Sequence, residues 1–458
     1  MRSFRRVALV LGSAALGILA FPPFGWTALA LVAWVPWLAA LRGVRPDRAL
    51  WLGYGHGLLL FGGTLSWLHG IFGLLAWPML GVLAAFPAAF ACLWAALGAS
   101  LKSWGGRSCG AAIAWIGLEH FRAEWFTLAF PWITPGTALP PGLLTPWIGC
   151  CGISGLVIAC GCSLLETARA PRVVGALLLA ALGASIAWPW RAPDAAPHLR
   201  HRVALVQGEG LGLERLLALT RSIAEPVDAI VWPELALSYD PREHPRVEAA
   251  LRLLLSEVGA ELLVIGARAR ARDGDGASCN AALLLASEGW IGPQPKQRLV
   301  PFVEPRRAPR ADDRLAHATA LGRVATPICF DLDASGVALA AVDAGAELLL
   351  VPSLDPASWG RVERLQHAEL ARHRAAELGL WVAVASGAGR TQVLDPTGSR
   401  RAELPLDVPG VLVAEIASVR ERTPFSRFGR ALGPVCAFLS LALAVGLLLE
   451  RRKRRPGA

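Results

Sequence analysis

Three residues have complementary chemistry: Glu234 in "VWPELAL" and Cys329 in "TPICFDLDASG", which both end predicted strands, and Lys296 in "PKQRLVPFVEP". A thiolate is a strong nucleophile, and a carboxylate can accept the proton of the thiol. An ammonium can stabilise both the thiolate and the oxyanion that forms when an acyl carbonyl is attacked. The set therefore favours acyl chemistry through a covalent intermediate on Cys329.

Two acidic residues and two histidines are further candidates for the chemistry at Cys329. Glu304 follows Lys296 by eight residues, and Asp331 follows Cys329 by two, on the same face if the strand continues. His367 and His373 lie on a later predicted helix, and a Cys–His protease would need one of them beside Cys329. Because the Glu–Lys pair already fills that role, we expect neither histidine to act on the thiol.

Other interpretations of the cysteines stay open. Cys329 could be a small buried hydrophobe, or it could form a disulfide with Cys279. The "CGC" of residues 160–162 has no His or further Cys nearby at ligand spacing, so we expect no metal site there. With no GxGxxG motif and no P-loop, no nucleotide or other cofactor is expected.

The region that carries these residues alternates strands with helices. Short apolar runs predict strands at 202–208, 229–233, 261–269, 280–287, 324–331, 346–353, 381–387 and 410–416. Helical patterns lie between them at 213–224, 244–260, 334–345 and 361–379. This alternation predicts an α/β domain whose sheets are covered by helices.

The rest of the chain is typical of an integral membrane protein. Of 458 residues, 54% are hydrophobic and only 17% are charged, against about 25% in an ordinary soluble domain. We expect eight spans, near 6–22, 25–41, 50–70, 74–100, 108–126, 143–166, 171–189 and 431–449. The net charge of +10 lies largely at the chain ends and between apolar segments, which argues against a nucleic-acid partner.

The distribution of basic residues predicts the orientation of the chain. An even number of spans puts both termini on one side, and that side carries 15 Lys or Arg residues, whereas the short loops of the other side carry Arg122 alone. By the positive-inside rule the termini are cytoplasmic and the α/β domain faces outward. The predicted organisation is a transmembrane bundle of about seven helices (1–190), a catalytic domain (191–430), a C-terminal transmembrane helix (431–450) and a basic cytoplasmic tail (451–458).

The order of Glu in "WPE", Lys in "KQRLVPFVE" and Cys in "ICFD" resembles the Glu-Lys-Cys triad of the carbon–nitrogen hydrolase (nitrilase) superfamily. The whole chain resembles one membrane-embedded branch, the apolipoprotein N-acyltransferases. Further matches are "FPPFGW" (21–26), "FPW" (130–132), "VQG" (206–208), "WG" (359–360), "QHAELARHRAAELG" (366–379) and "RTPFSRFG" (422–429). The chain differs from the family pattern at Val303, Phe330 and Asp331, which stand where Gly, Tyr and Glu are usual.

The resemblance implies a polytopic α-helical membrane bundle with a nitrilase-like αββα sandwich on the periplasmic side of the bacterial inner membrane. It implies that Glu234 is the general base, Lys296 the oxyanion stabiliser and Cys329 the nucleophile, with Glu304 and Asp331 in support. The implied partners are a phospholipid acyl donor and diacylglyceryl apolipoproteins. Two alternatives are a membrane-tethered amidase, which would hydrolyse its thioester with water, and a pseudoenzyme that binds lipid or lipoprotein without turnover.

Overall fold

The computed structural model describes residues 2–188, 199–270, 278–304 and 315–453, and the chain forms two compact units. Unit 1 comprises Met1–Trp190 with Arg427–Ala458, and unit 2 comprises Arg191–Ser426. The tail residues 454–458 and the segment 305–314, which lies between Lys296 and Cys329, fall outside the described residues. Each unit is described by itself below.

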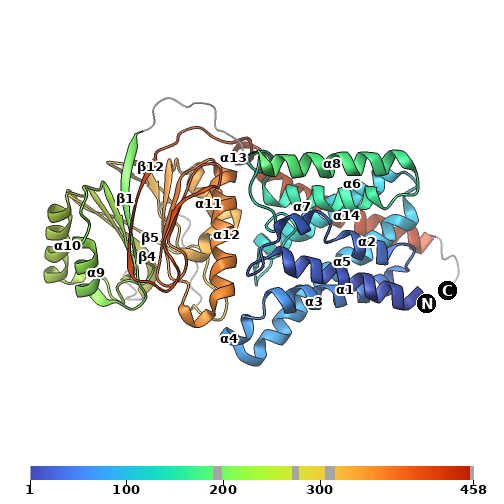
Figure 1. Ribbon diagram of the computed structural model, residues 1–458, viewed down its shortest axis with the longest axis horizontal. Helices are drawn as coiled ribbons and strands as arrows, with labels where there is room; N and C mark the ends of the chain where they lie inside the picture. The colour runs from blue at the N-terminus through green and yellow to red at the C-terminus, as the bar shows by residue number, and fades with distance from the viewer. Residues whose placement is uncertain (1, 189–198, 271–277, 305–314, 454–458) are drawn as a thin grey trace. The chain divides into compact units, whose positions relative to one another are not determined.

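Unit 1 is an all-helical bundle (Figure 1). Its α-helices are α1 (Arg2–Ala20), α2 (Val35–Leu41), α3 (Pro46–Thr64), α4 (Leu68–Phe72), α5 (Ala76–Ser100), α6 (Trp104–His120), α7 (Thr145–Leu164), α8 (Arg169–Ala187) and α14 (Leu432–Lys453). Within the described residues, five segments are long and apolar enough to cross a membrane: Ser3–Ala20, Leu68–Ser100, Thr145–Leu164, Arg169–Ala187 and Gly429–Leu449.

The three other predicted spans are helical, but their helices are too short or too polar to cross a membrane by themselves. The segment Thr27–Leu41 is apolar but shorter, because it is split into a 3-10 turn (Thr27–Leu31) and α2. Helix α6 has 17 residues, and α3 begins with Asp47 and Arg48 and is too polar. About 20 apolar residues are needed to cross the hydrocarbon core, so these helices span it only with polar or non-helical flanks.

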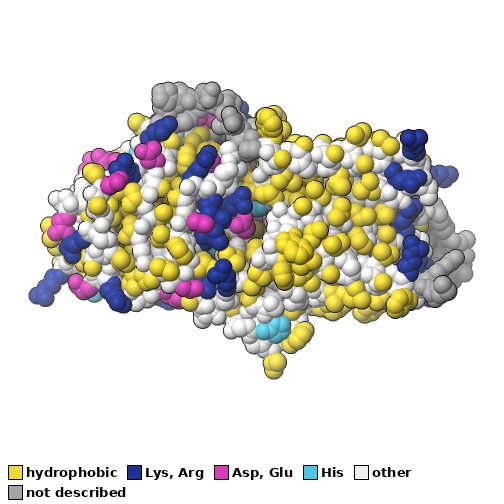
Figure 2. Space-filling view, viewed as in Figure 1, with side chains coloured by type: hydrophobic (Ala, Val, Ile, Leu, Met, Phe, Trp, Pro, Cys, Tyr) yellow, Lys and Arg dark blue, Asp and Glu magenta, His cyan; other side chains and the backbone are white. Residues whose placement is uncertain are grey.

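The surface of unit 1 has the pattern of a membrane-embedded bundle. Figure 2 shows a largely hydrophobic face on this unit, with Lys and Arg side chains gathered at the end where α1 begins and α14 ends. Large apolar side chains are exposed along α14, including Phe438, Leu441 and Leu448. An exposed apolar surface of this extent is costly in water, which favours a lipid environment.

Unit 2 contains two six-stranded sheets. In spatial order the first is β12 (Gly410–Ala417), β1 (Arg200–Gln207), β2 (Ala229–Val231), β3 (Leu262–Arg270), β4 (Ser278–Ala286) and β5 (Gly289–Pro295). The second is β11 (Arg400–Glu403), β10 (Gln392–Leu394), β9 (Val382–Ser386), β8 (Leu348–Ser353), β7 (Gly322–Ala325) and β6 (His317–Thr319). Strands β1–β2–β3 run parallel, as do β7–β8–β9.

Helices cover the outer face of each sheet and complete an αββα sandwich (Figure 1). Helices α9 (Gly212–Arg221) and α10 (Pro245–Val258) lie on the first sheet, and α11 (Ser335–Asp343) and α12 (Arg361–Leu378) lie on the second. This nitrilase-like α/β domain with two sheets confirms the predicted fold class for unit 2.

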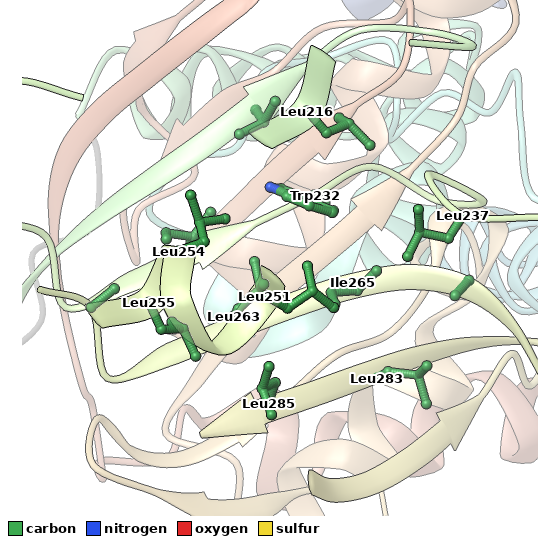
Figure 3. Close-up of a cluster of buried hydrophobic side chains, with 14 of the residues drawn as sticks. Leu216, Trp232, Leu237, Leu251, Leu254, Leu255, Leu263, Ile265, Leu283 and Leu285 are labelled. Carbon is green, nitrogen blue, oxygen red and sulfur yellow. The ribbon is translucent and has the colours of Figure 1, made fainter. Parts of the chain in front are cut away.

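Side-chain alternation along the strands builds the core in three layers. In β1, Val203 and Leu205 face the second sheet, while Ala204 and Val206 face the helices. Figure 3 shows the helix-facing cluster of the first sheet, in which Trp232 packs among leucines. Successive side chains of a strand point to opposite faces, so strands that are buried on both faces are apolar throughout.

The strand predicted at 324–331 is wrong in its second half. Strand β7 ends at Ala325, and Cys329 begins a 3-10 turn, Cys329–Leu332. Pro327 lacks an N–H and cannot continue the hydrogen-bonded ladder, which is a physical reason for the early end of the strand. Asp331 therefore shares a turn with Cys329, and not a strand face as we predicted. The short strands β5, β6, β10 and β11 were not predicted.

Candidate active site

Glu234 and Lys296 form a buried ion pair between two strands of the first sheet. Glu234 follows β2 and Lys296 follows β5 directly, and each is 4% exposed. The Lys296 ammonium lies 2.8 Å from Glu234 Oε1 and also 2.8 Å from Glu304 Oε2. A buried lysine thus has two carboxylates as counter-ions, which is the kind of pairing that makes burial of a charge tolerable.

Asn280 on β4 completes this network. Its Nδ2 group donates to Glu234 Oε1 at 2.6 Å and to Glu304 Oε1 at 2.9 Å. The backbone N–H of Val300 donates to Glu304 Oε2 at 2.9 Å, and the N–H of Lys296 donates to the carbonyl of Asn280. Both carboxylate oxygens of Glu304 and the Oε1 atom of Glu234 therefore accept hydrogen bonds, and these bonds fix the two side chains.

The pKa values follow from burial and pairing. Burial alone would lower the pKa of Lys296, but the neighbouring carboxylates of Glu234 and Glu304 raise it well above its ordinary value. Burial raises the pKa of Glu304, but Lys296 outweighs it and lowers that pKa overall. At neutral pH the lysine is an ammonium and Glu304 a carboxylate, as an electrostatic stabiliser of a negative transition state requires.

Cys329 lies at a strained turn. Its φ is 49°, in the left-handed region that residues with a Cβ adopt at a cost of about 1–3 kcal/mol, and such strain gathers at functional sites. The side chain is 7% exposed. Burial first, and then the charge of Glu234, raise the pKa of the thiol, while the charges of Lys296 and His367 lower it. Glu234 and Lys296 therefore act electrostatically on Cys329.

Asp331 links this turn to the loop that follows Lys296. Its Oδ1 accepts backbone N–H bonds from Gln297 at 3.0 Å and Arg298 at 2.6 Å, and its Oδ2 accepts one from Ile328 at 2.9 Å. Asp331 is fully buried, and burial raises its pKa to about 7. Asp331 thus holds the position of the two loops relative to each other.

A second charged cluster lies on another side of Cys329, at the start of α12. His367 Nδ1 is hydrogen-bonded to Asp355 Oδ1, and its Nε2 lies 2.9 Å from Asp333 Oδ1. One ligand atom each of Cys329, Asp355 and His367 lie within 4.8 Å of one another. His367 thus lies beside the thiol, because α12 packs against the turn of Cys329, while the expectation that neither histidine acts on the thiol stays a prediction.

Sequence reasoning did not single out Asn280, Asp333 or Asp355, and it set His367 aside. Asp355 follows β8, Asp333 follows the turn of Cys329, Asn280 is the third residue of β4, and His367 is the seventh residue of α12. The signal for Asn280 was a polar residue at the first position of the strand predicted at 280–287. Cys279 and Cys329 are not joined by a disulfide, so the disulfide alternative is wrong.

Comparisons with known proteins cover nearly all of the chain. A model described as apolipoprotein N-acyltransferase N-terminal domain matches residues 13–163, and one described as carbon-nitrogen hydrolase matches residues 178–424. The apolipoprotein N-acyltransferase of Azotobacter vinelandii is 30% identical, with 97% of this chain and 95% of that protein covered. The same-named protein of Pseudomonas aeruginosa strain PAO1 is 29% identical, with 98% and 97% covered.

Among solved structures, an amidase from Nesterenkonia sp. is 20% identical over 52% of this chain and 97% of that chain, with a TM-score of 0.39. The full-length relatives and the two matched domains confirm the family that the sequence motifs indicated. The chain belongs to the apolipoprotein N-acyltransferase family, and its second unit is a carbon–nitrogen hydrolase domain.

Proposed function

We propose that this protein transfers an acyl chain from a phospholipid, through a thioester on Cys329, to the N-terminal amine of diacylglyceryl-cysteine apolipoproteins. Membership of the apolipoprotein N-acyltransferase family supports an acyltransferase of lipoprotein maturation. The observation that carries the finer proposal is the buried Glu234–Lys296–Glu304 network, whose charges act on the Cys329 thiol.

The first half-reaction begins with a neutral thiol. Glu234 takes the proton of Cys329 as the sulfur attacks the ester carbonyl, and Lys296 stabilises the oxyanion. When the intermediate collapses, the C–O bond breaks, and the proton passes from Glu234 to the leaving oxygen. The products are a lysophospholipid and an acyl thioester on Cys329.

In the second half-reaction the lipoprotein amine attacks the thioester. The C–N bond forms, the C–S bond breaks, and Glu234 transfers one amine proton to the departing sulfur. An acceptor that arrives as an ammonium releases its remaining extra proton to solvent. The two half-reactions share one acyl-enzyme, so we expect ping-pong kinetics.

We also propose that unit 1 anchors the protein in the bacterial inner membrane with unit 2 on the periplasmic side. Five apolar helices and the basic end of unit 1 in Figure 2 support a multi-pass protein with that end in the cytoplasm. Both substrates are lipids, which explains why a catalytic domain is joined to membrane helices on both sides in the sequence. A cysteine reagent that cannot cross membranes tests this orientation: it should label a cysteine introduced at Arg401, which is exposed, in intact spheroplasts.

The acyl-enzyme is the decisive test of the mechanism. Purified full-length protein is incubated with phospholipid and no acceptor, and peptides are analysed by mass spectrometry. We expect the Cys329 peptide to gain the mass of one acyl chain, and we expect no such gain in Cys329→Ala. When a diacylglyceryl peptide is added, the acyl chain should leave Cys329 and appear on the N-terminus of that peptide. No adduct in the wild type would favour a lipid-binding pseudoenzyme, and release as free fatty acid would favour a hydrolase.

A further inference from the structure

The cluster beside Cys329 has the composition of a metal site. Cys329 Sγ, a carboxylate oxygen of Asp355 and a ring nitrogen of His367 lie within 4.8 Å of one another. These residues line a cavity of about 20 Å³, which is room for one water or one ion and too small for a substrate. Thiolate, imidazole and carboxylate are the ligands that zinc binds in proteins.

The outer partners of such a site are also in place. Asp355 Oδ2 accepts hydrogen bonds from the hydroxyls of Ser353 at 2.9 Å and Ser386 at 2.8 Å, which leaves Oδ1 toward His367. The Nε2 atom of His367 lies 2.9 Å from Asp333. Zinc-binding histidines almost always donate their second ring N–H to a carboxylate or carbonyl, and zinc-binding carboxylates are hydrogen-bonded in turn.

We propose that Cys329, Asp355 and His367 bind a zinc ion and that this ion reversibly blocks the nucleophilic thiol. Zinc takes the place of the proton between His367 Nδ1 and Asp355 Oδ1 and bonds to the Cys329 sulfur. Asp333 keeps its contact with His367 Nε2–H, and a water fills the fourth position. The thiol proton and the shared His367–Asp355 proton are both released, so no oxidant or reductant is needed.

The geometry favours zinc over magnesium or calcium. Magnesium and calcium prefer six or more oxygen ligands, whereas this site offers sulfur, nitrogen and oxygen. Tetrahedral zinc bonds of about 2.0–2.3 Å put ligand atoms about 3.5 Å apart. His367 Nδ1 and Asp355 Oδ1, which lie 2.5 Å apart, must therefore separate by about an ångström to admit the ion, while the Cys329 sulfur, within 4.8 Å of them, moves closer. Arg390 also lines the cavity, but its guanidinium is paired with Glu403, which reduces its repulsion of a cation.

The binding of metal is tested without reference to activity. Full-length protein in detergent is titrated with Co²⁺, which is a spectroscopic substitute for zinc, and the thiolate-to-cobalt charge-transfer band is recorded. We expect one equivalent to produce the band and zinc to abolish it by competition. Cys329→Ser should remove the band, and His367→Gln should remove or strongly weaken it. His244→Gln, at an exposed histidine of the same unit, should leave it unchanged.

The outer partners give a finer test. Asp333→Asn and Ser386→Ala keep all three ligands, and loss of an outer partner lowers metal affinity by about 10–100-fold. If both variants bind cobalt as the wild type does, the ion is not at this cluster. A band that persists in Cys329→Ser, or a wild-type protein that shows none, overturns the proposal.

The inhibitory consequence rests on the proposed function of Cys329. Zinc should slow the alkylation of Cys329 by iodoacetamide and the formation of the acyl-enzyme to the same extent, and a chelator should restore both. His367→Gln should lose the protection by zinc. If zinc protects Cys329 from alkylation and no acyl-enzyme forms even without zinc, the metal site stands and the proposed function fails. If the acyl-enzyme forms and zinc does not protect Cys329 from alkylation, the proposed function stands and the metal site fails.

Discussion

Replacing Lys296 by methionine tests the electrostatic core of the site. The Lys296 ammonium is the counter-ion of both Glu234 and Glu304 at 2.8 Å, and it is buried. Removal of one partner from a buried ion pair destabilises a protein by about 3–5 kcal/mol, because the remaining charge is left without compensation. Since a domain has about 5–15 kcal/mol of stability in total, unit 2 should remain folded but be close to its limit.

The loss should depend on pH in a defined direction. In the wild type, Lys296 holds the pKa of Glu304 below its ordinary value of 4.5, so the folded state binds fewer protons than the unfolded state. This contribution is present above pH 4.5 and is lost as the pH falls through the folded pKa. In Lys296→Met the buried carboxylates lose that cation and gain protons more easily, so the deficit relative to wild type should be largest at neutral pH and should shrink as the pH falls and those carboxylates become protonated.

Hydrogen–deuterium exchange of the buried amides of β4 and β5 measures this opening free energy directly. Arg221→Met is the matched control, because the Arg221–Glu257 pair is exposed and its loss should cost only about 0.2–1 kcal/mol. Glu304→Gln in the Lys296→Met background should recover part of the stability but none of the Cys329 acylation. Unchanged exchange in Lys296→Met would refute the pairing, and normal acylation would refute the catalytic role.

Three further substitutions separate positioning from packing. Asn280→Ala removes a donor to Glu234 and should slow acylation of the thiol about tenfold or more, with little change in phospholipid binding, measured by single-turnover kinetics. Gly266→Ala places a Cβ 2.2 Å from the carbonyl oxygen of Pro233 and 2.4 Å from Glu234 Cα, so it should displace Glu234 and abolish acylation, and normal acyl-enzyme formation would contradict this. Leu251→Ala, in the helix-facing core, should cost about 2–5 kcal/mol in hydrogen exchange and leave acylation unchanged at low temperature.

Much of the fold could be predicted because its elements are long and regular. The buried parallel strands are continuous apolar runs, and β1, β3, β4, β8, β9 and β12 lie where they were expected, to within a few residues. The strands that were missed are short or contain residues that lower β-propensity, such as Gly292 and Pro295 in β5. Propensity says little about three- or four-residue strands, because neighbouring strands and not the local sequence determine them.

Part of the candidate site could be predicted from the sequence and part could not. Glu234, Lys296 and Cys329 could be proposed because a carboxylate, an ammonium and a thiol at strand ends make chemical sense together and match a family order. The closeness of His367 to Cys329 could not be predicted, because it depends on how α12 packs on the second sheet, and no local pattern encodes that packing. The strained φ of Cys329 was also invisible, since a turn that follows Pro327 is compatible with several backbone conformations.

The two clusters compete for one sulfur, and this has a consequence for the resting protein. Burial raises the pKa of the Cys329 thiol, so at neutral pH the sulfur is protonated and is a weak nucleophile. In the proposed mechanism Glu234 takes this proton. A neutral buried thiol resists oxidation. In the proposed metal site the same thiol releases its proton to solvent when zinc binds to the sulfur, His367 and Asp355. In the proposed mechanism Glu234 activates the sulfur toward an ester, whereas in the proposed metal site a cation at His367 and Asp355 holds the sulfur inactive.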